Sequence, residues 1–280
     1  MPRFTVPDWV RKHDIVYEDY RKLPADFIPA LRAKLARFNH PEPVVSIVIP
    51  AWNEEPNILK TLSSLADIVT DYPTELVVID NNSKDRTAKI LEECGVRTVF
   101  EGRQGISLAR QTGLESAKGI YHLNADADSI YPSGWVNAYA GHLEKTKDCT
   151  CVYGRYSFIP SPGNSRFTLG SYELLAENLF SFRRKNKDFL NVMGFNFAFR
   201  RADGLKVGGF NTTRPRWSDG WMAMTLMNIG RIDLVKSDDA RVWTSDRRLM
   251  HDGGLGKAFI NRVKKEIKNI PHYFRKGAGK

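Results

Sequence analysis

Cysteine is scarce in this chain, with three cysteines among 280 residues. Cys94, Cys149 and Cys151 are odd in number, and none belongs to a Cys-x-x-Cys pair. Neither a disulfide framework nor a cysteine-based zinc site is therefore expected, and a reducing cytosol is the natural compartment.

Long hydrophobic runs are missing as well. No stretch approaches the ~18 consecutive apolar residues of a membrane-spanning helix. The first seven residues, MPRFTVP, lack the apolar core of a signal peptide. We therefore expect a cytoplasmic protein that does not cross the bilayer.

Positive charge, in contrast, is in excess and unevenly spread. The formal net charge is +10, and residues 241–280 contain eleven Lys or Arg against three Asp or Glu. From residue 251 on, apolar residues at helical spacing alternate with basic ones until Pro271. Residues 251–280 are therefore predicted to form a basic amphipathic tail, which either packs on the core or lies on an anionic membrane surface. No nucleic-acid partner is expected, because no recognition motif accompanies the charge.

Strand and helix patterns alternate through the first half of the chain. The β-branched runs at 44–50 and 75–80 are typical of strands buried on both faces. Helical periodicity follows the first run and returns at 106–117. This order predicts an α/β fold, a mostly parallel central sheet with helices on both faces. Ligands bind such sheets beyond the carboxyl ends of the strands, where polar clusters occur in this chain.

Asp126 and Asp128 follow the apolar run 119–123. In an extended strand alternate side chains share a face, so both carboxylates would point the same way and together hold a divalent cation beside a diphosphate. An Asp-x-Asp triplet by itself is more often a polar turn than a metal site. The other motifs of the chain must decide between these two interpretations.

An ordered series of motifs resembles the pattern of glycosyltransferase family 2. The series comprises residues 48–55 (VIPAWNEE), 78–85 (VIDNNSKD), 126–128 (DAD), 207–210 (VGGF) and 218–219 (SD). The resemblance extends over about residues 44–248 and implies the GT-A fold, a nucleotide-sugar-binding α/β domain. Residues 103–107 and 244–248 are similar to a bacterial branch that makes surface polysaccharides.

The domain organisation follows from this resemblance and from composition. Residues 1–43 are expected to form an N-terminal helical arm, and residues 44–250 the GT-A domain. Two prolines and a glycine at 160–165 separate a nucleotide-sugar half (44–159) from an acceptor half (166–250).

The resemblance assigns donor-binding roles. It implies that four residues line the base pocket: Pro50, Ala51, Trp52 and Glu54. Trp52 offers a stacking face, although packing at a strand edge also explains it. Asp80 matches the first residue of the family's usual Asp-Asp-Gly-Ser and is expected at the base or ribose. Asn81 and Asn82 depart from that motif, which leaves the conformation of the loop open.

The resemblance also implies a metal site. Asp128 is the expected direct ligand of Mn²⁺ or Mg²⁺, with Asp126 and Ala127 nearer the ribose. The cation would neutralise charge on the leaving diphosphate. His251 is a candidate third ligand, although a lone histidine in a loop is more often incidental.

Three arginines are further candidates for contact with the donor. Arg247 and Arg248 resemble the family's diphosphate clamp, or simply belong to the basic tail. Arg110 either reaches the nucleotide or lies on the surface.

Asp219 falls where the family places its general base, with Ser218 in the position of the preceding acid. A carboxylate there can take the proton from an acceptor hydroxyl as that hydroxyl attacks the anomeric carbon from the face opposite the diphosphate. Capping of the following helix is an alternative role, and both can hold together.

The predicted function is that of an inverting, metal-dependent glycosyltransferase of cell-surface polysaccharide synthesis. Its expected donor is a UDP-sugar, its acceptor a hydroxyl of a glycan or lipid-linked molecule, and its location the cytoplasm or the inner membrane face. A nucleotidyltransferase is the alternative enzyme class, but no glycine-rich phosphate loop with a lysine follows the first strand. A non-catalytic nucleotide-sugar-binding protein at the membrane is the third possibility.

Overall fold

The computed structural model describes residues 4–183, 187–214 and 217–246. Their seven-stranded central sheet has the order β3-β2-β1-β4-β8-β6-β9. The bounds are β1 Val45–Ala51, β2 Thr74–Asp80, β3 Arg97–Phe100, β4 Tyr121–Asn124, β6 Cys149–Gly154, β8 Phe197–Arg200 and β9 Arg231–Val235. Strands β1 to β4 are parallel, whereas β8 runs antiparallel to both of its neighbours, β4 and β6. The predicted mostly parallel α/β fold is confirmed.

Burial explains why the two first strands are so apolar. Every residue of β1 and β2 is buried. In β1, Ile47 and Ile49 join a core cluster with residues of the helices α3 (Ile58–Ala66) and α6 (Trp135–Lys145). Val48 packs on the other face with Ala109 of α5 (Ile106–Ser116). A strand covered on both faces needs apolar side chains at successive positions, which is why the run is nearly continuous.

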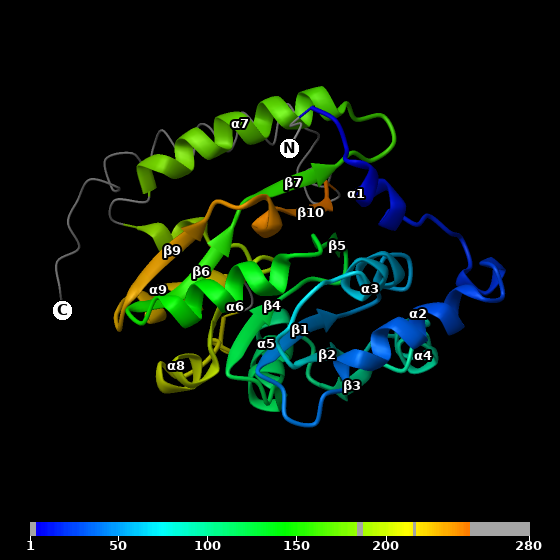
Figure 1. The fold of residues 1–280 in the computed structure, drawn as a ribbon, viewed down its shortest axis with the longest axis horizontal. Helices are drawn as coiled ribbons and strands as arrows, with labels where there is room; N and C mark the ends of the chain where they lie inside the picture. Colours follow the sequence, from blue (N-terminus) through cyan, green and yellow to red (C-terminus); the bar gives the residue numbers. More distant parts are fainter. Residues whose placement is uncertain (1–3, 184–186, 215–216, 247–280) are drawn as a thin grey trace.

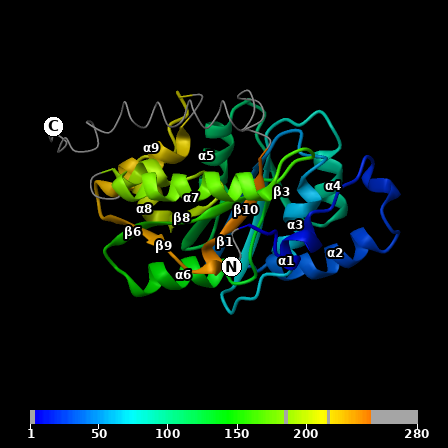
Figure 2. The same ribbon diagram turned by 90° about the horizontal axis from the view of Figure 1, so that it is seen from above.

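Helices cover both faces of the sheet (Figures 1 and 2). Their bounds are α3 Ile58–Ala66, α4 Thr87–Glu93, α5 Ile106–Ser116, α6 Trp135–Lys145, α8 Arg201–Lys206 and α9 Ser218–Met227. Helices α5 and α9 share a cluster with β6 and β8, through Leu114, Met222 and Leu226. Helix α7 (Arg166–Arg183) packs on a small second sheet of β5 (Ser129–Ile130), β10 (Val242–Ser245) and β7 (Tyr156–Ile159).

The N-terminal segment lies against α3 and β2 (Figure 1). It contains α1 (Asp8–His13), η1 (Tyr20–Lys22), α2 (Phe27–Leu35) and η2 (Ala36–Phe38). Its buried residues Leu31, Leu35 and Phe38 belong to the same cluster as β1 and α3. The segment is therefore packed on the sheet's own core.

The Asp-x-Asp triplet differs from the prediction in its backbone. Strand β4 ends at Asn124, so Asp126 and Asp128 lie in the turn before β5, and the extended alternation expected for them is wrong. The chain turns because β5 leaves the central sheet to pair with β10. The Asp126 N–H then donates to the Tyr131 hydroxyl at 2.8 Å.

None of the helices in the described part of the chain combines the length and the apolar character that a membrane span requires.

Candidate active site

A cleft of about 800 Å³ opens at the carboxyl edge of the central sheet. The segments that follow β1, β2 and β3 line it with Pro50, Ala51, Trp52, Glu54, Asn81, Gln104, Gly105, Ile106, Ala109 and Arg110. The Asp-x-Asp turn and the later part of the chain complete it with Asp126, Ala127, Asp128, Met193, Gly194, Phe195, Trp217, Ser218 and Asp219. The size is that of a small-molecule site, and the acidic groups converge inside it.

Hydrogen bonds from backbone N–H groups to side-chain oxygens hold the loops after β1 and β2 together. The Asn53 side-chain oxygen accepts from the Lys84 N–H at 2.7 Å, and the Ser83 hydroxyl accepts from the Asn53 N–H at 3.1 Å. The Thr87 hydroxyl accepts from the Glu54 N–H at 2.9 Å. The loop that carries Trp52 is thus fixed by the next loop, while the Trp52 ring itself is 54% exposed.

The hydrogen bonds of Asn81 explain why an amide stands where the family's motif usually has its second aspartate. Its Nδ2 donates to the carbonyls of Glu101 and Arg103, at 3.0 and 2.7 Å, and its Oδ1 accepts from the Gly105 N–H at 2.8 Å. An ionised aspartate accepts hydrogen bonds only, so it could not bind those two carbonyls. Asn81 therefore anchors the 101–105 loop against the cleft.

Asn82 retains the backbone conformation that the usual glycine would adopt. Its φ is +61°, in the left-handed region where asparagine is tolerated better than most residues. Asp80 lies one residue before Asn81, buried, and its Oδ1 accepts from the Ser83 N–H at 3.1 Å. The turn is thus present even though the sequence departs from Asp-Asp-Gly-Ser.

Arg110 connects the Asp-x-Asp turn with the acceptor half. Its guanidinium is an ion-pair partner of Asp126 at 3.3 Å and donates to the Ser218 hydroxyl at 2.8 Å. Arg110 is only 5% exposed, so its alternative surface role is excluded. Its Nε–H is buried and has no hydrogen-bond acceptor in the described part of the chain.

Gly194 lies against this arginine. A Cβ at position 194 would come within 1.8 Å of an Arg110 nitrogen. Any larger residue would displace the guanidinium, so only glycine allows the backbone at position 194 to lie this close to Arg110.

Tyr131 forms a second connection between the two halves. Its hydroxyl accepts from the Asp126 N–H and donates to the Phe195 carbonyl at 3.0 Å. Burial, with a smaller contribution from Asp126, raises the pKa of Tyr131 far above its usual value, so the hydroxyl stays protonated. The turn is thereby tied to the acceptor side.

Asp219 lies in the first turn of α9 and faces the cleft. Its Oδ1 accepts from the Gly220 N–H at 2.9 Å, one of the donors that a helix start leaves unpaired. Capping is therefore one of its functions, and its place in the cleft lining leaves the carboxylate available for a second.

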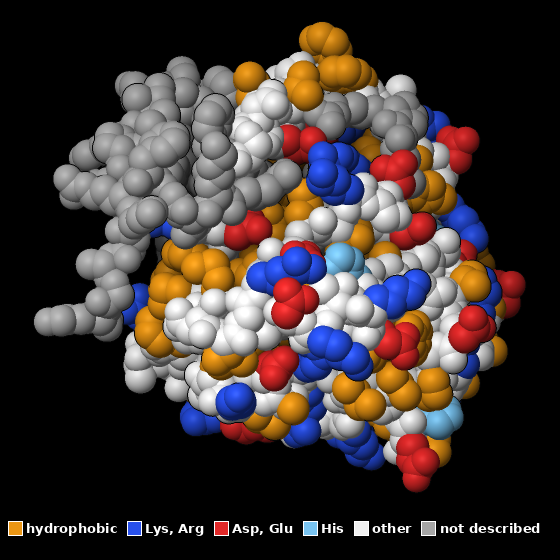
Figure 3. All heavy atoms as spheres, turned by 60° about the vertical axis from the view of Figure 1, so that its left-hand side comes forward, with side chains coloured by type: hydrophobic (Ala, Val, Ile, Leu, Met, Phe, Trp, Pro, Cys, Tyr) orange, Lys and Arg blue, Asp and Glu red, His pale blue; other side chains and the backbone are white. Residues whose placement is uncertain are grey.

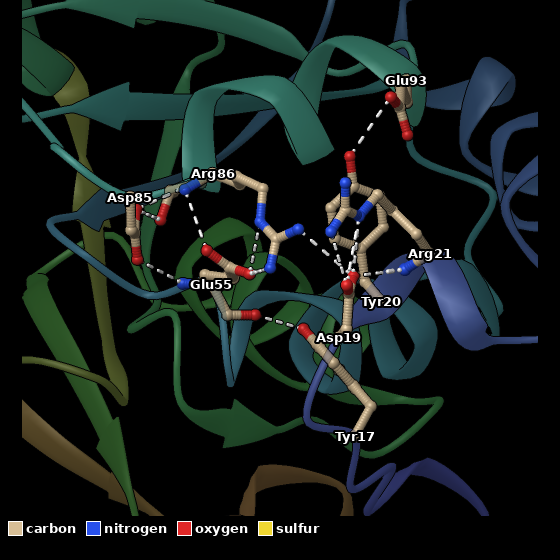
Figure 4. Close-up of polar contacts among 9 residues, drawn as sticks. Tyr17, Asp19, Tyr20, Arg21, Glu55, Asp85, Arg86 and Glu93 are labelled. Carbon is tan, nitrogen blue, oxygen red and sulfur yellow. Dashed lines mark hydrogen bonds and ion pairs between the residues drawn. The ribbon is translucent and has the colours of Figure 1, made fainter.

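The N-terminal segment makes polar contacts with the loops that follow β1 and β2. Tyr17 donates to the Glu55 carbonyl, and Arg86 lies between Glu55 and Asp19, with Nε–Oε1 at 2.8 Å and Nη1–Oδ1 at 3.2 Å (Figure 4). Asp85 in turn accepts from the Glu55 N–H at 3.0 Å. Residues of the N-terminal segment, outside the cleft lining, thus stabilise the turn that follows Trp52.

Comparison with known proteins settles the family. A sequence model described as Glycosyl transferase family 2 matches residues 46–204, more than half of the chain. The chain belongs to glycosyltransferase family 2. Within that family, uncharacterized glycosyltransferase EpsJ of Bacillus subtilis is 31% identical over 111 residues, 38% of this chain and 32% of that protein. Probable glycosyltransferase YdaM of the same organism is 27% identical over 202 residues, 67% of this chain and 47% of that protein.

The family 2 chain spans less than half the length of these two relatives. Solved structures share its GT-A fold. Glucosyl-3-phosphoglycerate synthase from Mycobacterium tuberculosis, in complex with Mn²⁺, UDP-glucose and phosphoglyceric acid, gives a TM-score of 0.55 at 21% identity, over 89% of this chain and 85% of that one. TarS 1–349 of S. aureus in complex with UDP-GlcNAc gives a TM-score of 0.54 at 19% identity, over 72% of this chain and 58% of that one.

The cleft brings together most of the residues predicted from the sequence. Nine of them line it: Pro50, Ala51, Trp52, Glu54, Arg110, Asp126, Ala127, Asp128 and Asp219. Asp80 lies at the same edge and holds the loop through Ser83, outside the lining. Arg247, Arg248 and His251 fall outside the described residues, so their roles stay predictions.

Several other lining residues were assigned no site role from the sequence, although Gln104 and Gly105 belong to the motif at 103–107. Gln104 and Gly105 enter the cleft because Asn81 fixes their loop, and Met193 and Phe195 enter it from the segment before β8. Their signal in the sequence is weak, since neither a glutamine nor an apolar pair marks a site. Only the tertiary hydrogen bonds place them.

The donor set of the turn fits a divalent cation. Two carboxylates, both buried, line the same cleft at positions 126 and 128. Mg²⁺ and Mn²⁺ are bound by carboxylate oxygens together with substrate phosphates and water. The ion pair with Arg110 fixes the Asp126 carboxylate beside that of Asp128 in the cleft.

Proposed function

We propose that this family 2 member transfers a sugar from a nucleoside-diphosphate sugar to an acceptor hydroxyl with inversion at the anomeric carbon. The observation that carries the proposal is that one cleft is lined by the Asp-x-Asp turn and by Asp219, from opposite halves of the domain. A direct displacement is assisted by a metal ion that stabilises the leaving diphosphate and by a general base that takes the proton of the acceptor hydroxyl.

The donor lies on the β1 and β2 loops in this proposal. Trp52 stacks on the base, the 101–105 loop closes one side, and Arg110 lines the floor between them. UDP-sugars are the proposed donors, because the two similar structures described above were solved with UDP-glucose and UDP-GlcNAc.

Asp126 and Asp128 would hold the cation, which supplies positive charge to the diphosphate as that group leaves. Arg110 keeps Asp126 oriented through their ion pair. Tyr131 holds the backbone of the turn, so the two carboxylates keep their positions.

Asp219 acts as the base. Its carboxylate takes the proton of the acceptor hydroxyl, and the hydroxyl oxygen forms the new bond to the anomeric carbon. The bond between that carbon and the diphosphate oxygen breaks, and its electron pair leaves with the nucleoside diphosphate. Attack from the opposite face inverts the configuration.

The test is turnover with a panel of UDP-sugars and calorimetric titration with UDP and Mn²⁺. Asp219→Asn should lower turnover by about a hundredfold or more and leave UDP affinity nearly unchanged, since general base catalysis contributes about that much. Asp128→Ala should abolish the metal-dependent part of UDP binding. Asp148→Asn, an exposed carboxylate outside the cleft, is the control and should change neither.

Three outcomes would overturn the proposal. Equal loss of UDP binding in Asp219→Asn would make that residue structural. UDP-sugar binding without transfer in the parent chain would indicate a non-catalytic binder, and release of pyrophosphate from a nucleoside triphosphate would indicate a nucleotidyltransferase.

We also propose that the acceptor belongs to cell-surface polysaccharide synthesis and that the basic tail, 251–280, contacts anionic lipid headgroups at the inner membrane face. The support is the charge pattern of that segment in the sequence. Sedimentation with anionic vesicles tests the membrane contact.

A further inference from the structure

Trp217 has a backbone conformation that is unfavourable for a tryptophan. Its φ is +69° and its ψ is 32°, in the left-handed region. The other two non-glycine residues with positive φ in the described chain are asparagines, which tolerate this region. A bulky residue persists there only where its surroundings enforce it, and such residues cluster at functional sites.

The indole is held against Gly220 and Phe189, and part of it remains exposed. Its Nε1 lies 2.0 Å from the place where a Cβ on residue 220 would stand, so only glycine fits beneath it. Phe189 meets it edge to face, with ring centroids 6.1 Å apart. The side chain is still 39% exposed and lines the cleft.

Helix capping does not account for this residue. Trp217 occupies the N-cap position of α9, yet its side chain makes no cap hydrogen bond. A glycine or asparagine would adopt the same backbone at lower cost. The aromatic ring, and not the backbone conformation, is therefore the feature of Trp217 that calls for a functional explanation.

We propose that Trp217 is the platform on which a neutral sugar ring of the acceptor stacks, so that the acceptor is a glycan and not a small anion. The inference rests on the proposed function. An indole face binds the C–H face of a pyranose. Asp219, two residues further along the same helix start, is then next to the stacked sugar as its base.

Charge in the cleft supports a neutral acceptor. Among the described lining residues, Arg110 is the one with a basic side chain, and it is paired with Asp126 and Ser218. The acceptor half contributes Phe195 and Trp217 together with the carboxylate of Asp219. Aromatic faces and a negative charge suit a sugar better than they suit a phosphorylated acid.

The experiment combines binding and stability. Saturation-transfer NMR would measure contact of a panel of methyl glycosides, and of 3-phosphoglycerate, with the UDP-loaded protein. Trp217→Gly should reduce glycoside affinity about tenfold, the order of one stacked aromatic contact, and leave UDP affinity unchanged. The same change should raise the melting temperature, because glycine relieves the left-handed strain. Trp217→Phe should retain most of the glycoside affinity.

Several results would overturn the inference. They are unchanged glycoside contact in Trp217→Gly, a lower melting temperature in that variant, no glycoside contact in the parent, and binding of 3-phosphoglycerate in place of glycosides. Failure of the proposed function shows differently, as absence of UDP binding or of transfer in the parent chain.

Discussion

His122 is a fully buried histidine in β4, in the middle of the central sheet. Its ring stacks on Phe199 of β8, with centroids 4.9 Å apart. Burial lowers the pKa of His122 from 6.5 to about 3, because the charged form would lose its hydration. The residue is therefore neutral at physiological pH and acts as a packing group.

The pKa of His122 makes the fold sensitive to acid. The unfolded chain binds a proton near pH 6.5, whereas the folded chain does not until about pH 3, so stability is complete above pH 6.5 and is lost as the pH falls below it. His122→Phe should remove this loss. Between pH 6.5 and about pH 5 the variant should gain about 2 kcal/mol of unfolding free energy relative to the parent.

Urea denaturation at a series of pH values would measure this difference. The exposed His40→Gln variant is the control and should follow the parent. Parallel pH curves for the parent and His122→Phe would contradict the prediction.

At the scale of elements, the N-terminal arm contributes to the site without touching it. The family match begins at residue 46, so α1, η1 and α2 are an addition to the matched region. Arg86 at the start of α4 holds the arm to the donor loop, through Asp19 on one side and Glu55 on the other (Figure 4). The arm therefore stabilises the turn that carries Trp52.

Arg86→Gln should weaken donor binding through this contact. We expect KM for the UDP-sugar to rise by a factor of a few with kcat unchanged, because the loop loses order while the chemistry of Asp219 is untouched. Arg11→Gln removes an exposed ion pair with Asp8 elsewhere on the arm and is the matched control. A fall in kcat at unchanged KM, or equal effects of both variants, would contradict this role.

At the scale of the whole molecule, charge is divided between body and tail. Residues 247–280 carry ten Lys or Arg and two Asp or Glu, so the rest of the chain has 32 basic and 30 acidic residues. On the face shown in Figure 3, basic and acidic side chains are interspersed. A long-range attraction to an anionic surface must therefore come from the tail.

Vesicles that contain phosphatidylglycerol would test this attraction by sedimentation at low salt. Each lysine near such a surface contributes about 1 kcal/mol, so the triple variant Lys264→Gln, Lys265→Gln, Lys268→Gln should bind about a hundredfold more weakly. The control changes the same charge on the body, at Lys34, Lys89 and Lys145. Equal weakening by both triples, or no binding of the parent, would contradict the membrane proposal.

Local pattern was sufficient for the elements and for the position of the site. Continuous β-branched runs indicate β1 and β2 because strands covered on both faces need apolar residues throughout. Polar motifs directly after those runs indicate the cleft, because parallel strands end at one edge.

The details of the site depend on contacts between distant residues, which no local pattern contains. The sequence by itself determined the α/β order, the family resemblance and the place of Asp126, Asp128 and Asp219 at strand or helix ends. Only the tertiary structure decided that the Asp-x-Asp triplet is a turn, since β5 pairs with a strand more than a hundred residues later. It also decided that Arg110 is buried and that Trp217 is left-handed, because packing and long-range hydrogen bonds set both.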